Sequence, residues 1–206
     1  MITTLNNYNT NTLNQFDGVF RYSKIIGLVD NTDTSIVSNI TTLKIRKEFT
    51  PTIGASTRYD VYYRNALYNP HSGHNSAAGG ILTSTGFKID GDTSTIFFLD
   101  DDGQGNVRRY SLSGSTRVYD NNTQGTIDYT TGKITLNSLH ISEVGNVDGA
   151  TSTTIRLTVV PNSVDVVPVR NQVIEIDETN TTVVVTADDY DTTSGIGYTT
   201  ATNYAS

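Results

Sequence analysis

Two histidines in a glycine-rich stretch are the first residues whose spacing could support chemistry. His71 and His74 lie three positions apart in "YNPHSGHNSAAGG", and an extended loop could bring both imidazoles to one metal ion. A metal site needs at least a third ligand, and the sequence offers no cysteine and no HExxH motif to complete the set. We therefore expect two exposed loop histidines, with metal binding as the weaker alternative.

A run of acidic residues next to glycines is the second candidate. "DDDGQGN" begins at Asp100 and includes Asp102, and clustered oxygen ligands of this kind favour calcium. Counted from Asp100, an EF-hand loop would need Glu at its twelfth position, where this chain has Ser111. It would also need flanking helices, whereas the neighbouring residues alternate as strands do. We interpret the run as an acidic hairpin turn, with Asp100 and Asp102 as weak metal candidates.

No residue pattern indicates covalent or acid–base catalysis. The sequence has no GxSxG elbow, no phosphate-binding glycine motif that opens a helix, and no cysteine nucleophile. Carboxylates are plentiful, but sequence alone cannot pair two of them across a cleft as a glycosidase requires. We expect no catalytic site, no cofactor and no small-molecule substrate.

Tyrosine is the commonest aromatic residue, with 12 copies and no tryptophan. Tyr59, Tyr62 and Tyr63 form a dense group in "STRYDVYYRNAL". Tyrosine is enriched at protein interfaces because it joins an apolar ring to a polar tip. These residues either contribute to a subunit interface or alternate toward the core with their hydroxyl groups in water, and the sequence weighs the two equally.

Composition favours a β-rich extracellular or virion protein over a cytosolic helical enzyme. Of 206 residues, 35% are hydrophobic and 17% are charged, against about 25% charged residues in a typical domain. The net charge of −7 argues against nucleic-acid binding, which depends on Lys and Arg. The first residues lack the features of a secretory signal, and no apolar run approaches the ~20 residues of a membrane span. We expect a protein that is assembled in a cytoplasm and used outside it.

Hydrophobic periodicity divides the chain into four segments. We expect a flexible arm at 1–15, a small α/β segment at 16–80 with a glycine-rich loop at 69–80, a β-rich domain at 81–187, and a low-complexity tail at 188–206. The predicted fold class is α+β and β-rich. Short N-terminal helices with strands come first, and a mainly antiparallel β domain follows.

Individual elements follow from the same patterns. Tyr22, Ile25, Ile26 and Val29 have the spacing of a helix face, and a second short helix is expected up to Val37. His140 is expected at a strand edge. Strands are predicted at 43–48 and 59–64, in two hairpins with turns at 101–105 and 130–132, and in "STTIRLTVVP", "NQVIEID" and "TTVVVTAD".

The stretch "VVPNSVDVVPVRNQVIEID" compresses prolines, valines and charges into residues 159–177. Pro161 ends a strand because proline has no N–H for the ladder, and Pro168 fixes an extended crossing. Arg170 either pairs with a carboxylate of this stretch, such as Asp165, or reaches a neighbouring subunit; the internal role is favoured. Asp165, Pro168 and Arg170 therefore join the tyrosines as candidate subunit-interface residues.

Three motifs occur in order along the chain: "FDGVFRYSKIIGLVDNTDTSIVSNITTLKIRK", "GTIDYTTGKITL" and "PNSVDVVPVRNQVIEID". Together they resemble the C-terminal portion of the baseplate wedge ring protein of T-even-like and cyanophage-like contractile-tailed phages, in the baseplate J-like group. The resemblance spans most of residues 16–180, and the final "SGIGYTTATNYAS" also resembles family C-termini.

The resemblance implies a structural protein of the virion, in the tail baseplate, that is assembled in the host cytoplasm and is not an enzyme. Its implied partners are a second copy, in a dimer or ring, and other baseplate wedge subunits. Neither nucleic acid nor a membrane is an expected partner. The alternative from the residues alone is a phage or bacterial adhesin that binds glycans through loops at 71–75 or 100–106. A glycan-degrading enzyme is the third hypothesis.

Overall fold

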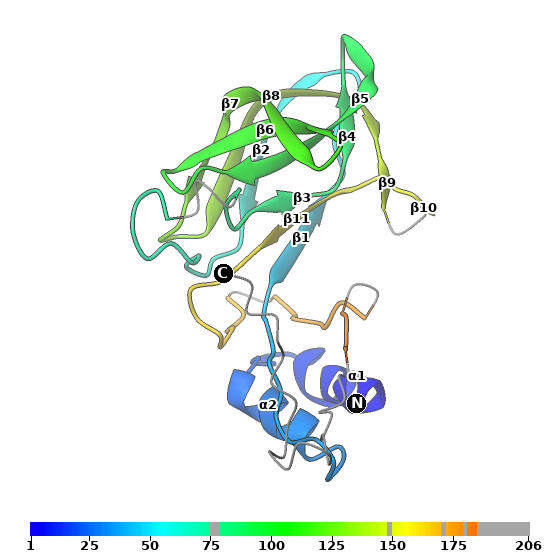
Figure 1. The fold of residues 1–206 in the computed structure, drawn as a ribbon, viewed down its shortest axis with the longest axis vertical. Coiled ribbons are helices and arrows are strands. Elements are labelled where there is room, and N and C mark those ends of the chain that lie inside the picture. The colour runs from blue at the N-terminus through cyan, green and yellow to red at the C-terminus, as the bar shows by residue number, and fades with distance from the viewer. Residues whose placement is uncertain (75–78, 148–149, 170–171, 179–180, 185–206) are drawn as a thin grey trace, which may run out of the picture.

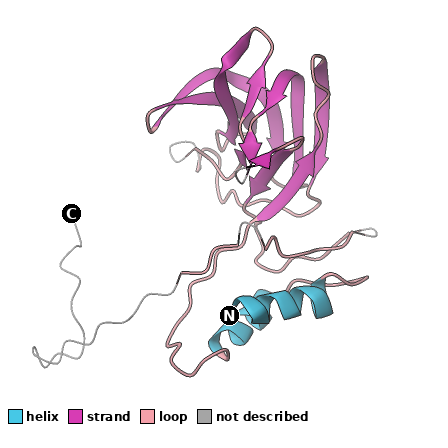
Figure 2. Ribbon diagram, turned by 90° about the vertical axis from the view of Figure 1, so that its right-hand side faces the viewer, coloured by secondary structure: helices cyan, strands magenta, loops and turns pink. Residues whose placement is uncertain are grey.

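The computed structural model describes residues 1–74, 79–147, 150–169, 172–178 and 181–184, and these residues form a helical unit below a β unit (Figure 1). Two segments far apart in the sequence connect the units: the chain that enters the first strand and the chain that leaves the last one. Figure 2 shows how narrow this connection is compared with either unit.

The helical unit contains α1 (Ile2–Tyr8), the π-helix η1 (Asn9–Leu13) and α2 (Tyr22–Asp30). Its core consists of one face of each helix and a residue from the far end of the chain: Tyr8, Leu13, Phe20, Ile25, Val29 and Val166. The helix spacing read from Tyr22 to Val29 is confirmed. Residues 2–13, which lie within the arm expected at 1–15, are helical, because Tyr8 and Leu13 gain a buried environment that a single sequence segment does not provide.

The second short helix expected up to Val37 is wrong, since no helix follows α2 before the first strand. Thr32 closes α2 instead of starting a new helix, because its hydroxyl group donates to the carbonyl of Leu28 at 2.9 Å. The Asp33 carboxylate accepts the Ser35 N–H at 2.9 Å in a local turn. Two β-branched residues then follow, and they favour extended backbone.

All strand pairings in the β unit are antiparallel. Its strands are β1 (Ile45–Phe49), β2 (Ser56–Tyr62), β3 (Thr83–Ser84), β4 (Phe87–Ile89), β5 (Asp92–Asp101), β6 (Asn106–Ser113), β7 (Thr116–Asp128), β8 (Lys133–Val144), β9 (Asn146–Val147), β10 (Ala150–Thr151) and β11 (Ile155–Val159). The largest sheet has the order β2-β8-β4-β5-β6-β7, and a further β8–β7 pairing closes it into a barrel-like structure. The orders β1-β11-β3 and β10-β9 describe the two smaller sheets.

The core of the β unit lies inside this closed sheet and extends to the β1-β11-β3 sheet. Alternate residues of each strand face inward, as the period of a half-buried strand requires. The fully buried side chains include Phe87, Leu99, Ile134, Leu136, Leu139, Ile141, Ile155 and Leu157. Both predicted hairpins are present, β5–β6 and β7–β8. The α+β, β-rich fold class is confirmed.

The strand expected in "NQVIEID" is wrong for its described part, because residues 172–178 belong to no sheet. Ile174 and Ile176 instead pack against the core of the helical unit. The N–H of Ile176 donates to the side chain of Asn9 at 2.8 Å rather than to a neighbouring strand. Residues 181–184 also lack strand structure, and the tail at 188–206 lies outside the described residues. The four segment boundaries drawn from the sequence stay a prediction.

Candidate functional site

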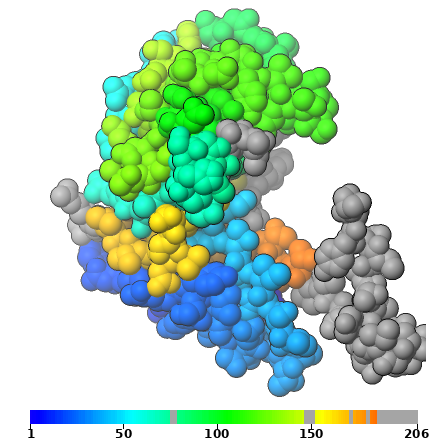
Figure 3. Space-filling view, turned by 60° about the vertical axis from the view of Figure 1, so that its left-hand side comes forward, coloured from blue at the N-terminus to red at the C-terminus, as the bar shows by residue number. Residues whose placement is uncertain are grey.

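The connection at residues 161–169 holds the two units together. Phe20 and Val166 form an antiparallel bridge with reciprocal backbone hydrogen bonds of 2.9 and 3.0 Å. On the other side, the Asn162 N–H donates to the Ala66 carbonyl of the β unit at 2.8 Å. In Figure 3 this yellow segment lies between the blue helical unit and the green β unit. The stretch expected to be a shaped connection between strands is therefore a clasp between two units.

Asp165 ties this clasp to the start of α2. One carboxylate oxygen accepts the backbone N–H of Tyr22 at 2.9 Å, and the other lies 2.8 Å from Nη1 of Arg21. An acceptor at this position satisfies an N–H that the helix itself cannot pair. The hydrogen bond from Arg21, and then that from the Tyr22 N–H, lower the pKa of Asp165. The Asp165 carboxylate pairs with Arg21; Arg170 lies outside the described residues, and Pro168 is half-buried.

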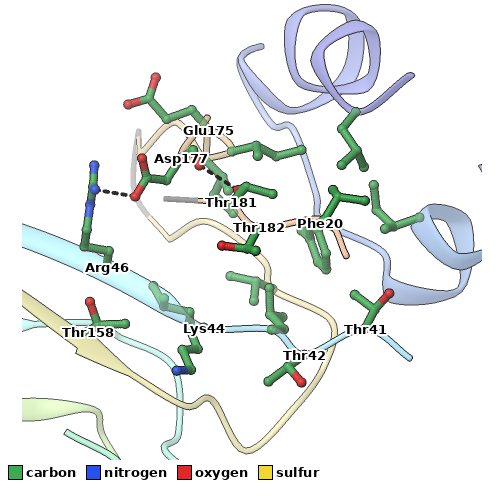
Figure 4. A pocket seen from close by; sticks show the side chains of 18 of the residues that line it. Phe20, Thr41, Thr42, Lys44, Arg46, Thr158, Glu175, Asp177, Thr181 and Thr182 are labelled. Atoms are coloured by element: carbon green, nitrogen blue, oxygen red, sulfur yellow. Dashed lines mark hydrogen bonds and ion pairs between the residues drawn. The ribbon is translucent and has the colours of Figure 1, made fainter. Parts of the chain in front are cut away.

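A groove of about 2030 Å³ lies between the units. One wall is the chain that leads into β1, and the other is formed by residues 172–177 and 181–184. Figure 4 shows Arg46 of β1 reaching across to Asp177, an ion pair that links the two walls. Arg46 also contacts Glu48 at 3.2 Å, and Glu48 in turn accepts from Arg156 at 2.9 Å. These ion pairs neutralise the charges of Arg46, Glu48 and Asp177 within the chain.

Aliphatic side chains are exposed on both walls of this groove and on the clasp. The exposed fraction is 99% for Ile40 and 87% for Val37 on the first wall. Further exposed valines occur on the clasp and the second wall: Val164, Val167, Val169, Val173 and Val184. A concentration of exposed aliphatic residues in one region marks an interaction surface more than scattered single residues do.

The three candidate interface tyrosines have different environments. Tyr63 is fully buried, and its hydroxyl group donates to the Leu157 carbonyl at 2.5 Å, so its side chain presents no surface to a partner. Tyr59 is half-buried, stacks on Phe49 and accepts the Thr52 N–H at 2.8 Å. Tyr62 is exposed beside the Lys133 ammonium group. Of the three, Tyr62 is the most exposed, at 45%.

Asp100 is fully buried on one side of β5. Its carboxylate accepts hydrogen bonds from Arg108 Nε at 2.9 Å, Arg117 Nη1 at 2.5 Å and the Tyr119 hydroxyl group at 2.7 Å. Arg117 also donates to the Gly79 carbonyl at 3.1 Å. A buried carboxylate is tolerated because two guanidinium groups compensate its charge. Asp100 therefore anchors the end of the glycine-rich loop.

Asp101 is fully buried on the opposite side of β5. Its Oδ1 accepts the N–H groups of Ile81 and Leu82 at 2.7 and 2.8 Å, and its Oδ2 accepts the Tyr129 hydroxyl group at 2.6 Å. Burial, and next the hydrogen bond to Asp101, raise the pKa of Tyr129. Successive residues of a strand point to opposite faces. The two adjacent carboxylates therefore hold different parts of the chain against the two faces of β5.

Asp102 shapes the β5–β6 turn. It accepts the N–H groups of Gln104 and Asn106 at 2.8 and 3.0 Å, and the side-chain amide of Asn106 at 2.7 Å. Burial alone would raise the pKa of Asp102, but these hydrogen bonds outweigh it and lower the pKa. Asp102 thus follows the hairpin-turn interpretation, whereas Asp100 and Asp101 lie in β5. The three carboxylates of the acidic run serve three internal purposes and do not converge on one point.

The histidines of the loop lie together on the surface. Nδ1 of His74 is 3.0 Å from Nε2 of His71, and the edge of the His74 ring meets Tyr68. The loop docks on the β5–β6 turn, because the Gly73 N–H and the Asn69 side-chain amide both donate to the Gly103 carbonyl. Within the described residues, no group of three or more His, Asp or Glu side chains could hold a metal ion. His140 is half-exposed in β8, with Nδ1 3.5 Å from Asp90.

Sequence reasoning missed the roles of Asp100 and Asp101. Both were read as part of a turn, because three consecutive acidic residues before glycines resemble one. The apolar run "IFFL" directly before them does indicate their position. It predicts a buried strand, and both residues are the last residues of that strand rather than part of the loop. Apart from the Gly103 N–H, which donates to Asp101, the partners of their carboxylates lie 8 to 28 residues away in sequence, so only the fold brings them together.

The described residues form two units with exposed aliphatic side chains at their junction. Residues 1–48, which form the helical unit and lead into β1, match the family model of the baseplate structural protein gp6, C-terminal domain III. This match supports a structural protein of a phage baseplate, located in the virion tail and in contact with other baseplate subunits. A search of the curated proteins finds no match. Within the described residues, no helix has the length and apolar character needed to cross a membrane.

Proposed function

We propose that the chain is a wedge subunit of a contractile-tail baseplate and that it attaches subunits to one another, by pairing with a second copy or by contacting other wedge subunits in the ring. The observation that carries this proposal is the set of exposed valines on the clasp. Val164, Val167 and Val169 are exposed next to Asp165 and Pro168, in the third of the motifs that resemble the wedge ring protein.

Two features support an attachment role over an enzymatic or glycan-binding one. Most of the matched segment 1–48 forms the helical unit, whose core is completed by Val166 of the clasp, and the clasp fixes that unit to the β unit. The loops suggested for glycan recognition form hydrogen bonds within the chain, including those of Asp102 and of the docked loop at 69–74. Polar groups that are already paired within the chain are less free to bind a sugar.

The test replaces one exposed valine on the clasp and one elsewhere. Val167→Asp places a charge on the proposed surface. Val118→Asp is its control, because Val118 lies in β7, away from the clasp, and is exposed to nearly the same extent (49% against 48% for Val167). We expect the first variant alone to lose self-association in light scattering or binding to other wedge subunits. A wild-type chain that stays monomeric at high concentration and binds no wedge subunit would contradict the proposal.

A further inference from the structure

Residues 38–44, which lead into β1, have the side-chain pattern of a strand. Asn39, Thr41 and Leu43 are half-buried, whereas Ile40, Thr42 and Lys44 are exposed, and the alternation continues into Ile45. This period of two is that of a strand with one face covered. Figure 1 shows the segment running from the helical unit into β1 without a turn.

This strand-like segment has no strand partner among the described residues. No backbone–backbone hydrogen bond joins residues 38–44 to the described chain, and β1 itself pairs with β11 along one edge only. The Tyr22 hydroxyl group donates to the Thr41 carbonyl at 2.8 Å, and the Asn39 side-chain amide donates to Asp30 and to the Ile26 carbonyl. These contacts all involve side chains and leave the strand edge unpaired among the described residues. An open edge of this kind can accept an added strand.

The apolar side chains at this edge are the most exposed of the large hydrophobic residues. The exposed fraction is 99% for Ile40 and 87% for Val37, above those of Val184 and Phe16. Covering such β-branched side chains with a neighbouring strand would remove them from water, and β-branched residues pack well across paired strands.

The charges at the same edge indicate what the added strand carries. Among the described residues, three side-chain cations have no carboxylate or ring partner: Lys44, Lys47 and Arg64. Lys47 is half-buried and lies opposite Leu157 in the β1–β11 pair. The Leu157 carbonyl accepts a hydrogen bond from the hydroxyl group of Tyr63, and Arg64 follows Tyr63 in the chain. Burial, and next the positive charge of Arg64, lower the pKa of Lys47. Unpaired cations that repel one another in an acidic chain are complementary to an anionic partner.

We propose that an extended, acidic segment of a partner subunit adds to this open edge, pairing with residues 38–49 and placing Asp or Glu beside Lys44 and Lys47. This inference rests on the proposed attachment function and names the chemistry of the partner at that junction. Small apolar side chains of the added segment cover Ile40. Its carboxylates occupy positions three apart, since Lys44 and Lys47 face opposite sides of the strand.

The groove leaves room for such a segment. Figure 4 shows Thr41, Thr42, Lys44 and Arg46 in succession along the first wall, with the Lys44 ammonium group directed away from Glu175 and Asp177. A carboxylate next to Lys44 would therefore avoid the acidic side chains of the second wall. Lysines on an open edge also discourage unselective strand pairing. An acidic partner strand would be attracted by the same lysines, so the edge would favour that partner over others.

Carbodiimide cross-linking of isolated baseplates tests the proposal, because the reagent joins lysine amines to carboxylates that touch them. Two internal pairs serve as positive controls: Lys88 with Glu143 at 2.7 Å and Lys133 with Asp60 at 3.7 Å. We expect mass spectrometry to find Lys44 and Lys47 joined to Asp or Glu residues, three apart, in one segment of another chain. Cross-links from these lysines only to this chain, or none while both controls form, would overturn it.

Two double variants separate charge from cross-linking chemistry. Lys44→Arg with Lys47→Arg keeps the positive charge but removes the amines, so incorporation into baseplates should persist without the cross-links. Lys44→Glu with Lys47→Glu should lower incorporation by roughly tenfold or more, because like charges would meet across the strands. Equal incorporation of both variants would contradict the strand proposal but not the attachment function. Absence of the wild-type chain from baseplates would contradict the attachment function itself.

Discussion

Asp165 and Arg21 are 144 positions apart in sequence, and their side chains meet at 2.8 Å where the clasp reaches the start of α2. The same carboxylate accepts the first helical N–H of α2, at Tyr22. A residue of the C-terminal third thus completes a helix of the N-terminal unit. The clasp and α2 should therefore depend on each other for stability.

Asp165→Asn should lower the stability of the helical unit. The amide keeps one acceptor oxygen but loses the charge that favours the Arg21 contact and the helix N-terminus. Because the folded pKa of Asp165 lies below its ordinary 3.8, its contribution is complete above about pH 4 and is lost as the pH falls through the folded pKa. Urea unfolding of both proteins near pH 7 and near pH 3 checks this. A difference that stays the same at both pH values would contradict the electrostatic account.

Asp101→Ala should be among the most damaging single changes. It leaves the N–H groups of Ile81 and Leu82 and the Tyr129 hydroxyl group without their acceptor in a buried place. Removing one partner of a buried charged network costs about 3–5 kcal/mol of unfolding free energy. Asp102→Ala is the control, because its hydrogen bonds lie in the partly exposed β5–β6 turn.

Denaturant unfolding of the two aspartate variants separates these cases. If Asp102→Ala lost as much stability as Asp101→Ala, the loss in Asp101→Ala could not be attributed to the hydrogen bonds that hold Ile81 and Leu82. Should Asp101→Ala fail to fold, Tyr129→Phe provides a milder measurement. It removes one hydrogen bond to the carboxylate and should cost about 1.5–3 kcal/mol.

Gly80→Ala should destabilise the protein far more than Gly54→Ala. Both glycines have a left-handed backbone, with φ of 78° and 74°, so an alanine at either position costs about 1–2 kcal/mol. Only at Gly80 would the new Cβ lie 1.9 Å from Asp101 Oδ1, whereas at Gly54 it would meet nothing within 4 Å. The clash should add about 1–3 kcal/mol. Thermal unfolding of both variants is the measurement, and equal losses would rule out a loop held tightly against Asp101.

Four tyrosines should resist ionisation in the folded protein. Burial raises the pKa of Tyr63, Tyr110, Tyr119 and Tyr129, and the Asp100 or Asp101 carboxylate adds to the shift for the last three. A raised folded pKa means that stability is complete below the ordinary value of 10.0 and is lost as the pH rises above it. Ultraviolet titration should show these residues ionising together with alkaline unfolding. Reversible ionisation of all tyrosines without unfolding would contradict the buried network.

Much of the β unit could be predicted from sequence because its strands are formed by local patterns. The alternation of Ile127 and Tyr129 before a glycine turn, and of Ile134 and Leu136 after it, is sufficient to define the β7–β8 hairpin. The helix face of α2 is equally local. One prediction failed where distant residues compete: residues 172–177 have the apolar pattern of a strand, but Ile174 and Ile176 pack against the helical core.

The candidate sites were predictable only in part. Asp102 behaves as the turn residue that its glycine neighbours indicate, since its partners are two to four residues away. Tyr63 shows the opposite case, because its strand position alone could not tell whether the ring faced the core or solvent. Its burial depends on β11, which contributes the Leu157 carbonyl from 94 residues later.

By itself, the sequence determined the β-rich class, the hairpins, helix α2, the lack of cysteine chemistry and the acidic, hydroxyl-rich surface, because each depends on composition or on neighbours within a few residues. Only the tertiary structure decided that Asp100 and Asp101 are buried anchors rather than a calcium loop. It also decided that Asp165 completes α2 and that residues 38–44 keep an open edge. Those outcomes depend on which distant donors, acceptors and strands the closed sheet brings into contact, and one-dimensional periodicity does not encode that pairing.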